Sequence, residues 1–262
     1  MKSKIILVVI TTVFSLLQNT IFAQEIPAIP SKKTFMMELN FKPFGENIIS
    51  FNQLQMKHRV SDNFALRLGL AFDHNTLDLS DDDYDPSEPY KVTGNEKITK
   101  FGFLPGFEYH FLKNSKISPY WGIEFSLINQ SVKSHYKDFK QEYNSGNSKY
   151  VPVEIDIDGA TRKITAEYIR NPIYPGYYYY SYTEYLDRAY SSFGGNLLAG
   201  CDFYFMRHVY VGVEVGLGYN HVYNKKVTIN TSDEVNPTIL PSHTIGKFGF
   251  YYNSALRLGF WF

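Results

Sequence analysis

The clearest pattern in the chain is an alternation of large apolar residues with small or polar ones. From Phe248 to Phe262 nearly every second residue is aromatic or aliphatic, and the residues between them include Gly249, Asn253 and Arg257. Successive side chains of a β-strand point to opposite faces, so this segment predicts a strand with one apolar face. At about 3.3 Å per residue and a tilt near 45°, about 13 residues rise roughly 30 Å, the thickness of a bilayer core.

The same alternation recurs through the chain and predicts eight strands. They are expected at 35–42, 53–60, 64–73, 101–111, 120–127, 193–205, 209–220 and 248–262. Their second face is mostly Gly, Ala and Asn with isolated charges. A soluble β-sandwich would instead carry a strongly polar outer face. Glycine is depleted from ordinary strands, but a narrow barrel interior needs small residues, so we expect lipid outside and a tight polar interior.

The lengths of the connections support the same architecture. Short links at 61–63, 112–117 and 206–208 alternate with longer links, which lie at 43–49, 75–97, 133–190 and 223–246. Short periplasmic turns and longer extracellular loops are the rule in bacterial outer-membrane barrels. The sequence therefore predicts an all-β, transmembrane, antiparallel up-and-down barrel of eight strands with both termini in the periplasm. Pro105 cannot donate to a strand ladder, so we expect a bulge or local break there.

The first residues have the order of a secretory signal peptide. Lys2 and Lys4 precede an apolar run that ends at Leu17, and a small residue follows at Ala23. The run is shorter than the roughly 20 residues that a spanning helix needs. We therefore expect a signal peptide at 1–23 and an outer-membrane barrel at 24–262, with the long extracellular loops at 75–97, 133–190 and 223–246.

The longest loop contains a further alternating segment. Apolar residues alternate from Val151 to Ile157 and again from Ile164 to Tyr168, around the turn dipeptide Asp158-Gly159. This pattern predicts a hairpin. Each arm is shorter than the 9–11 residues of a spanning strand, so we expect the hairpin above the membrane. A barrel of ten strands is the alternative if the hairpin enters the bilayer.

A tyrosine-rich segment follows this hairpin. Exposed tyrosines supply rigid, amphipathic contact area for protein or glycan partners. The alternative is that they pack on the hairpin or lie at the lipid headgroups. The candidate surface-binding residues are Tyr174, Tyr177, Tyr178, Tyr179, Tyr180 and Tyr182.

Isolated charges in the inward phase are the most specific feature of the predicted strands. The set is Glu38, Lys57, Arg59, Arg67, Glu108, Glu124, Asp202, Glu214 and Arg257. Buried charges are tolerated when they are paired, so we expect a salt-bridge network that plugs the lumen. Arg257 is expected beside Glu38 and Glu214, and Arg67 beside Glu108. The alternative is a pore that conducts small solutes.

Candidates for chemistry are weaker. Glu108 and Glu124 have the residue type of an acid/base pair, but they face a lumen that we expect to be filled. His221 and Ser254 share the outward phase, as an enzyme that modifies lipid A would require. The acidic run 81–85 lacks the Gly and terminal Glu of a calcium loop. We expect no cofactor and no metal.

Composition narrows the field further. Lys and Arg balance Asp and Glu at 26 each, so no basic excess points to nucleic acid. Cys201 is the only cysteine, so no internal disulfide can form. Aromatic residues make up 17% of the chain, which fits both strands and membrane-interface belts.

The chain resembles the small outer-membrane β-barrel proteins of the OmpA/OmpX type, specifically the porin-family barrels common in Bacteroidota. The resemblance lies in the segments 42–51 (KPFGENIISF) and 60–69 (VSDNFALRLG) and in the aromatic ending 256–262 (LRLGFWF). It implies an outer-membrane location among lipid and lipopolysaccharide, and assembly by the barrel-assembly machinery. It carries over no catalytic or ligand residues. From the sequence as a whole we expect a non-catalytic protein, structural or surface-binding through its loops, with a small-solute channel and a lipid A-modifying enzyme as the alternatives.

Overall fold

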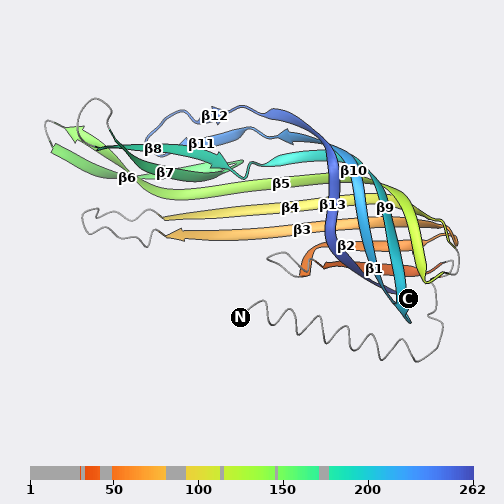
Figure 1. Cartoon of the computed structure of the whole chain (residues 1–262). Coiled ribbons are helices and arrows are strands. Elements are labelled where there is room, and N and C mark those ends of the chain that lie inside the picture. Colours follow the sequence, from red (N-terminus) through yellow and green to blue (C-terminus); the bar gives the residue numbers. More distant parts are fainter. Residues whose placement is uncertain are drawn as a thin grey trace.

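The computed structural model describes residues 30, 33–41, 49–80, 93–112, 115–144, 147–170 and 177–262. The expected signal peptide lies outside them. Regular structure within these ranges is β-strand (Figure 1): β1 Phe35–Phe41, β2 Ile49–Arg59, β3 Phe64–Ser80, β4 Thr93–His110, β5 Ile117–Asn144, β6 Asn147–Asp158, β7 Thr161–Arg170, β8 Tyr177–Leu186, β9 Tyr190–Met206, β10 Val209–Asn224, β11 Val227–Thr231, β12 Thr238–Leu240 and β13 His243–Trp261. Among the described residues, no helix has the length and apolar character needed to cross a membrane.

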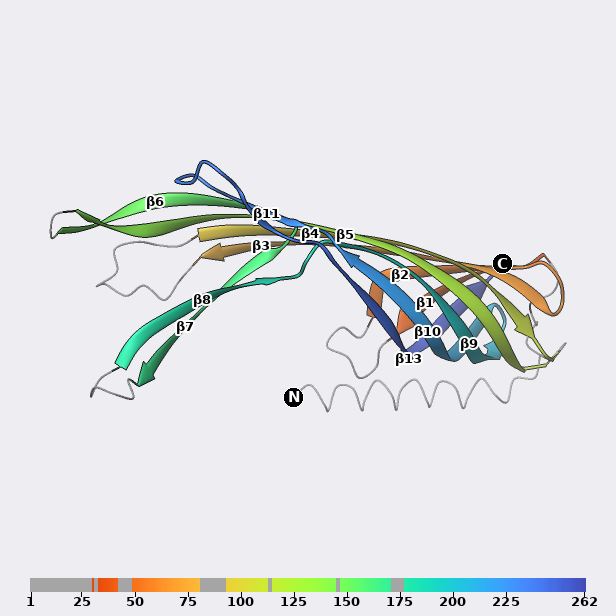
Figure 2. The ribbon, with the colours of Figure 1, turned by 90° about the horizontal axis from the view of Figure 1, so that it is seen from above.

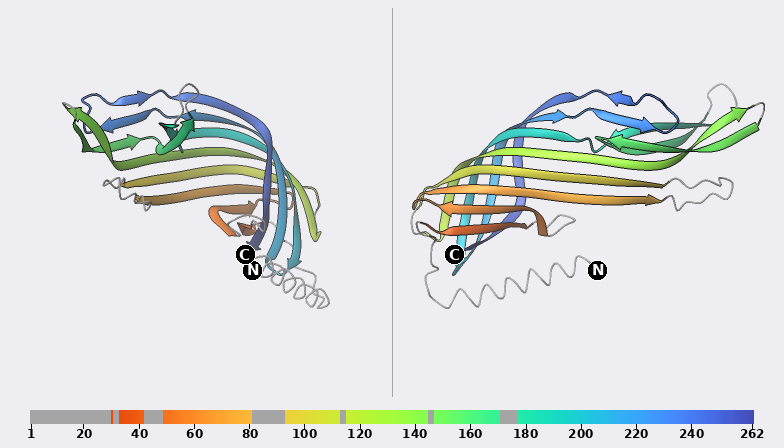
Figure 3. Two further views of the ribbon diagram at one scale, coloured as in Figure 1. Left: turned by 60° about the vertical axis from the view of Figure 1, so that its left-hand side comes forward. Right: turned by 180° about the vertical axis from the view of Figure 1, so that it is seen from behind.

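Eight of the strands close into a ring. The order around it is β1, β2, β3, β4, β5, β9, β10 and β13, with β13 pairing back to β1. Every neighbouring pair is antiparallel, and Figure 3 shows the long strands of the ring from two further sides. The prediction of an eight-stranded antiparallel barrel is confirmed. The ten-strand alternative is wrong, because β6 and β7 lie outside the ring.

Inward and outward phases follow the predicted alternation. On β5, Tyr120 and Glu124 are buried, whereas Trp121 and Phe125 between and beyond them are exposed. The register is regular along most of the wall, so each inward row meets an inward row of the next strand. Large apolar side chains therefore cover the outside of the ring, and polar ones fill its lumen.

Several strands continue well beyond the predicted membrane span. β3 and β4 remain paired as far as Ser80 and Thr93, and β5 runs on to Asn144. Much of the predicted loops 75–97 and 133–190 is therefore strand, and the predicted loop 223–246 contains β11 and β12. The sequence missed these extensions because both faces of a strand can be polar outside a membrane, so the apolar alternation stops while backbone pairing continues.

The extensions form an arm at one end of the barrel (Figure 1). We define the arm as residues 133–144 of β5 together with β6, β7, β8, β11 and β12. β6 pairs with β5 on one edge and with β11 on the other, and β12 adds to β11. β7 and β8 pair as a separate two-stranded ribbon, which diverges from the sheet of the arm in Figure 2.

The predicted hairpin around Asp158-Gly159 is wrong. β6 and β7 flank this dipeptide, but β6 pairs with β5 and β11, and β7 pairs with β8. Both edges of β6 are thus taken by other strands. Gly159 has a φ of 105°, a conformation that favours glycine, and its N–H donates to the carbonyl of Val132 at 2.9 Å. The dipeptide redirects the chain from the sheet into the ribbon.

The ring of strands has a local interruption in its backbone pairing at Pro105. Bridges between β4 and β5 stop after Phe103↔Leu127 and resume at Gly106↔Glu124, with the register unchanged. Pairing of β4 with β3 continues through Pro105, which lies opposite Leu68. The missing N–H therefore interrupts one ladder without a bulge.

Candidate functional site: a charged network inside the barrel

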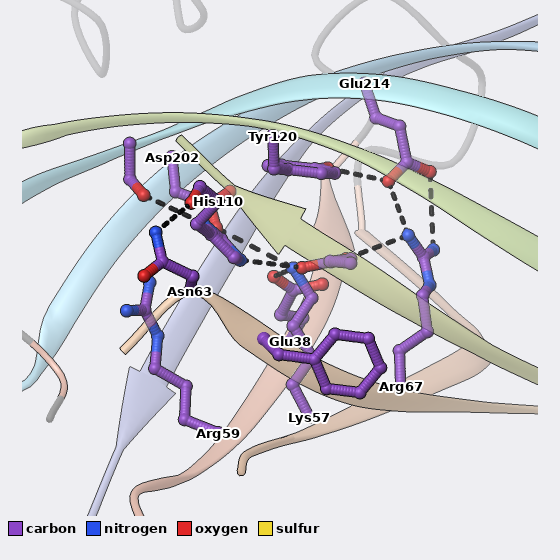
Figure 4. A network of polar contacts seen from close by, with 12 residues as sticks. Glu38, Lys57, Arg59, Asn63, Arg67, His110, Tyr120, Asp202 and Glu214 are labelled. Carbon is purple, nitrogen blue, oxygen red and sulfur yellow. Dashed lines mark hydrogen bonds and ion pairs between the residues drawn. The ribbon is translucent and has the colours of Figure 1, made fainter. Parts of the chain in front are cut away.

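The structure brings eight of the nine predicted inward charges together in the lumen. Each of the eight strands of the ring contributes one of these side chains, and Figure 4 shows many of them converging on one another. They are Glu38, Lys57, Arg67, Glu108, Glu124, Asp202, Glu214 and Arg257. We call this set the lumen network. Its members are almost completely buried.

Arg257 on β13 connects three carboxylates from three other strands. Its Nη1 lies 3.3 Å from Glu38 Oε2 and 3.3 Å from Glu214 Oε2. Its Nη2 lies 3.0 Å from Asp202 Oδ1. Because each contact joins a different strand to β13, the guanidinium ties the wall together across the lumen.

Arg67 on β3 is the second cation of the network. Arg67 lies 2.9 Å from Glu108, 2.9 Å from Glu124 and 2.7 Å from Glu214. The network is thus continuous, because Arg67 and Arg257 share Glu214.

Lys57 links the other side of the network. Its Nζ lies 2.8 Å from Glu38, 2.8 Å from Glu108 and 3.7 Å from Asp202. Each of the three cations therefore contacts three carboxylates, which is the arrangement that makes full burial of ionised groups tolerable. Removal of one partner would leave several charges uncompensated.

Arg59 does not join the network. Its guanidinium donates to the hydroxyl of Tyr204 at 3.2 Å and to the backbone carbonyl of Asp62 at 3.0 Å. Tyr204 belongs to a buried cluster with Met36, Tyr210 and Trp261. This cluster lies beside the short link 206–208, at the end of the lumen opposite the arm.

Three polar side chains, those of Tyr120, Tyr210 and His110, also contact the network. They were not identified as candidates from the sequence. The Tyr120 hydroxyl donates to Glu214 at 2.7 Å and accepts from Arg257, and the Lys57 ammonium lies 5.1 Å from its ring centroid. The Tyr210 hydroxyl donates to Glu38 at 2.5 Å. Both tyrosines occupy inward positions on their strands, as the charged residues do. This inward position is the sequence feature from which their role could have been predicted.

His110 is the third of these side chains. Its Nε2 lies 3.3 Å from Glu108 Oε2, and its Nδ1 lies 2.8 Å from the Ser118 hydroxyl. Like Tyr120 and Tyr210, it occupies an inward position on its strand, between the network and the short links.

Glycine makes room for the network at Gly212 on β10. A Cβ atom there would lie 2.5 Å from Asp202 Oδ1 and 2.8 Å from Arg257 Nη2. Both atoms belong to the salt bridge between these residues, so a larger side chain would displace it. This close approach explains why a strand residue of low β-propensity occupies this inward position.

One group in the network has the residue types of a metal site. Ligand atoms of Glu108, His110 and Asp202 lie within 4.8 Å of one another. However, the Lys57 ammonium already contacts Glu108 and lies near Asp202. A dication between the same carboxylates would meet this positive charge at short range, so the group is explained by the network itself.

The lumen is hollow above the network, on the side of the arm. A cavity of about 440 Å³ is lined there by Glu124, Ser126, Asn196, Asn220 and Lys247, among others. Glu124, which is bound to Arg67, forms part of its floor. The cavity therefore ends at the network.

The other candidates for chemistry are not assembled. Ser254 follows Asn253, which lies opposite Glu214, whereas His221 lies opposite Gly246. His221 and Ser254 are therefore separated by several positions, roughly 25 Å along the strands at about 3.3 Å per residue. Glu108 and Glu124 are both held by Arg67. The acidic run 81–85 lies outside the described residues.

The tyrosine-rich segment lies on the ribbon of the arm. Tyr174 falls outside the described residues. The backbone of β8 places Tyr177, Tyr178, Tyr179, Tyr180 and Tyr182 opposite β7, where their partners are Arg170, Ile169, Tyr168, Glu167 and Thr165.

Comparisons with known proteins give one structural similarity. No family model matches the chain, and no curated protein matches it. The chain is similar to the crystal structure of CarO from Acinetobacter baumannii, at 11% sequence identity, over 88% of this chain and 97% of that chain. The TM-score is 0.29.

Proposed function

We propose that the chain is an integral outer-membrane barrel with a closed lumen, and that its arm serves as a binding surface outside the cell. One observation carries the proposal: a closed ring of strands has apolar side chains on its outer surface and ion pairs in its lumen. This arrangement is the inverse of a soluble protein, in which apolar side chains fill the interior.

Exposed apolar side chains form a belt of limited height on the outside of the ring, among the side chains that the structure describes. Phe101, Phe125, Phe193 and Val215 are each more than half exposed. Exposed belts of this kind mark surfaces that meet a membrane or a partner. On β9 the outward apolar positions run over about 13 residues, which rise roughly 30 Å at a tilt near 45°. Above this belt the outward residues become polar, as at Asn129 on β5.

Cell fractionation tests the location. The full chain expressed in a Gram-negative host should pellet with outer membranes and resist extraction by carbonate or urea. In detergent the folded barrel should migrate faster on gels before boiling than after it. Recovery of the mature protein in the soluble periplasmic fraction would contradict the proposal.

The closed lumen predicts no steady conductance. The network spans the lumen with shared charges, and at its level the narrow interior of an eight-stranded barrel is occupied by side chains. A small-solute channel is the second candidate, and the cavity above the network favours it. Planar-bilayer recordings of the purified protein separate the two: a quiet bilayer supports the closed barrel, and steady large conductance supports the channel.

The proposed binding surface is the tyrosine-rich ribbon. Replacement of the tyrosines among residues 177–182 by Ser should abolish binding of whole cells to immobilised matrix proteins or glycans, because it removes amphipathic contact area. Tyr223→Ser, at an exposed position on β10 of the barrel, is the matched control. Unchanged binding by the ribbon variant, with normal barrel assembly, would exclude the ribbon as the binding surface.

A further inference from the structure

Gly195 on β9 is a glycine that the chain's own packing does not require. It lies in the outward row of the apolar belt, between Phe193 and Leu197, which are both more than half exposed. A Cβ atom added there would meet only Phe125 among the described residues, at 3.9 Å. Its φ is not in the left-handed region. A strand glycine without an internal reason often marks the close approach of another molecule.

The missing side chain leaves a groove on the outside of the wall. The groove has a volume of about 220 Å³, and its apolar lining comes from Ile123, Leu197, Leu217, Tyr219 and Phe248. Phe125 and Tyr219 lie opposite Gly195 on the two neighbouring strands. A single saturated chain fits such a lining, because the groove offers apolar contacts on both sides and a glycine backbone as its base.

Polar and basic side chains lie directly above the groove, toward the arm. On β10 the next outward residue after Tyr219 is His221, whose ring lies 4.8 Å from that of Phe193. The Lys225 ammonium reaches across β9 and donates to Asn129 Oδ1 at 2.9 Å. Asn129 lies opposite Ser191, four positions beyond Gly195 and roughly 13 Å along the strand at about 3.3 Å per residue.

Lys225 is held in place and lacks a carboxylate partner within 4 Å among the described residues. The Arg188 guanidinium donates to the backbone carbonyl of Lys225 at 2.8 Å and to that of Pro241 at 2.8 Å. This fixes the segment that carries the ammonium. Its contact with Asn129 is neutral, so the positive charge remains available to an anion at the upper edge of the belt.

We propose that this surface is a binding site for a phosphorylated acyl lipid of the outer leaflet. One acyl chain lies in the groove over Gly195, and a phosphate contacts Lys225, with His221 and the Tyr219 hydroxyl between them. The inference rests on the proposed membrane location and adds a specific ligand to it. Any lipid chains could cover the apolar belt, whereas the groove and the Lys225 ammonium together favour a lipid that has both an acyl chain and a phosphate.

The test uses the full mature protein in detergent micelles, titrated with bisphosphorylated lipid A and analysed by native mass spectrometry. Gly195→Leu fills the groove, and its control is Ala199→Leu, at an exposed outward position on the same strand. We expect Gly195→Leu to lower lipid affinity about tenfold, and the control to stay within about twofold.

The charge is tested separately with Lys225→Gln, and Lys226→Gln is the control at the next, exposed position. Lys225→Gln should weaken binding about fivefold, the effect of one lysine near a charged lipid surface. It should also abolish the preference for bisphosphorylated over dephosphorylated lipid A.

The outcomes separate this inference from the proposed location. Equal lipid binding by Gly195→Leu and Ala199→Leu overturns the inference, while the protein still fractionates with outer membranes. A second outcome would also overturn the inference: the wild type is a dimer, and Gly195→Leu converts it to monomers without loss of bound lipid. The groove would then be a contact between two copies of the chain. Recovery of the wild type as a soluble protein contradicts the location itself.

Discussion

The lumen and the arm both contain ion pairs, but the pairs have different surroundings. Arg257 and Glu38 in the lumen have fully buried side chains, 3.3 Å apart. Lys137 and Glu154 on the arm lie 3.8 Å apart, with side chains 61% and 59% exposed. Water screens the second pair, so its formation changes the free energy of unfolding little. The first pair has no water to replace a lost partner, so it stabilises mainly through the penalty for its loss.

The apolar residues show the opposite arrangement. In the arm, Ile157, Ala160, Val227 and Ile229 are buried around Tyr136, as in a small soluble domain. In the barrel the large apolar side chains face outward and the charges face inward. The same chain thus uses two stabilising schemes, and the change from one to the other follows the upper edge of the apolar belt.

The largest effect is expected from the centre of the lumen network. Arg257→Leu leaves Glu38, Asp202 and Glu214 without a shared cation and should destabilise the barrel by about 3–5 kcal/mol. Urea titration of the protein in micelles, followed by heat-modifiable gel migration, measures the loss. Arg59→Leu is the matched control, because Arg59 is buried but outside the network, and it should shift the midpoint less. Equal midpoints for Arg257→Leu and wild type would show that the network is dispensable.

The sequence predicts the barrel far better than the arm, for a physical reason. A strand with an apolar outer face and a narrow polar lumen must alternate, so the phase of β5 or β13 can be determined from residue types alone. Residues 133–144 of β5 meet water on their outer face and lose this signal. The pairing of these residues with β6 was also not predictable. The Asp158-Gly159 dipeptide suits a hairpin turn between β6 and β7, but both edges of β6 are occupied by β5 and β11.

The lumen network was predictable as a layer and unpredictable in its details. Inward phase identifies Arg257 and Glu38 as neighbours across β1 and β13. It does not show how far a long side chain reaches, so the departure of Arg59 toward Tyr204 could not be foreseen. Tyr120 had the right phase, but only the geometry shows that its hydroxyl joins Glu214 to Arg257.

An intermediate effect, confined to the arm, is expected from Tyr136. Its hydroxyl donates to Glu96 at 2.5 Å and accepts from the backbone N–H of Arg162 at 2.8 Å. Tyr136→Phe leaves both partners unsatisfied and should cost about 1–3 kcal/mol. Limited proteolysis should then cut the ribbon sooner, while heat-modifiable migration of the barrel stays unchanged. Loss of barrel stability would show that the two regions are coupled.

The same tyrosine gives the arm a defined response to alkaline pH. Burial, together with the hydrogen bond to Glu96, raises the pKa of Tyr136 to about 12. The unfolded chain ionises near the ordinary value of about 10, so the stability from the neutral hydroxyl is complete below about pH 10. It declines progressively between about pH 10 and 12. Melting curves at stepped pH should show this decline in wild type and a smaller one in Tyr136→Phe.

The smallest effect is expected from Lys137→Ala on the arm. The ammonium lies 3.8 Å from Glu154 and both side chains are mostly exposed, so the loss should stay below about 1 kcal/mol. Raising the salt concentration from about 0.01 to 1 M should remove even that difference, since the Debye length falls from about 30 to 3 Å. The loss from Arg257→Leu should persist at high salt, because Glu38, Asp202 and Glu214 are fully buried below the cavity, where ions do not reach them to screen their charge. If both variants responded to salt alike, water and ions would have to reach the network, and burial could not explain why its ion pairs differ from those on the arm.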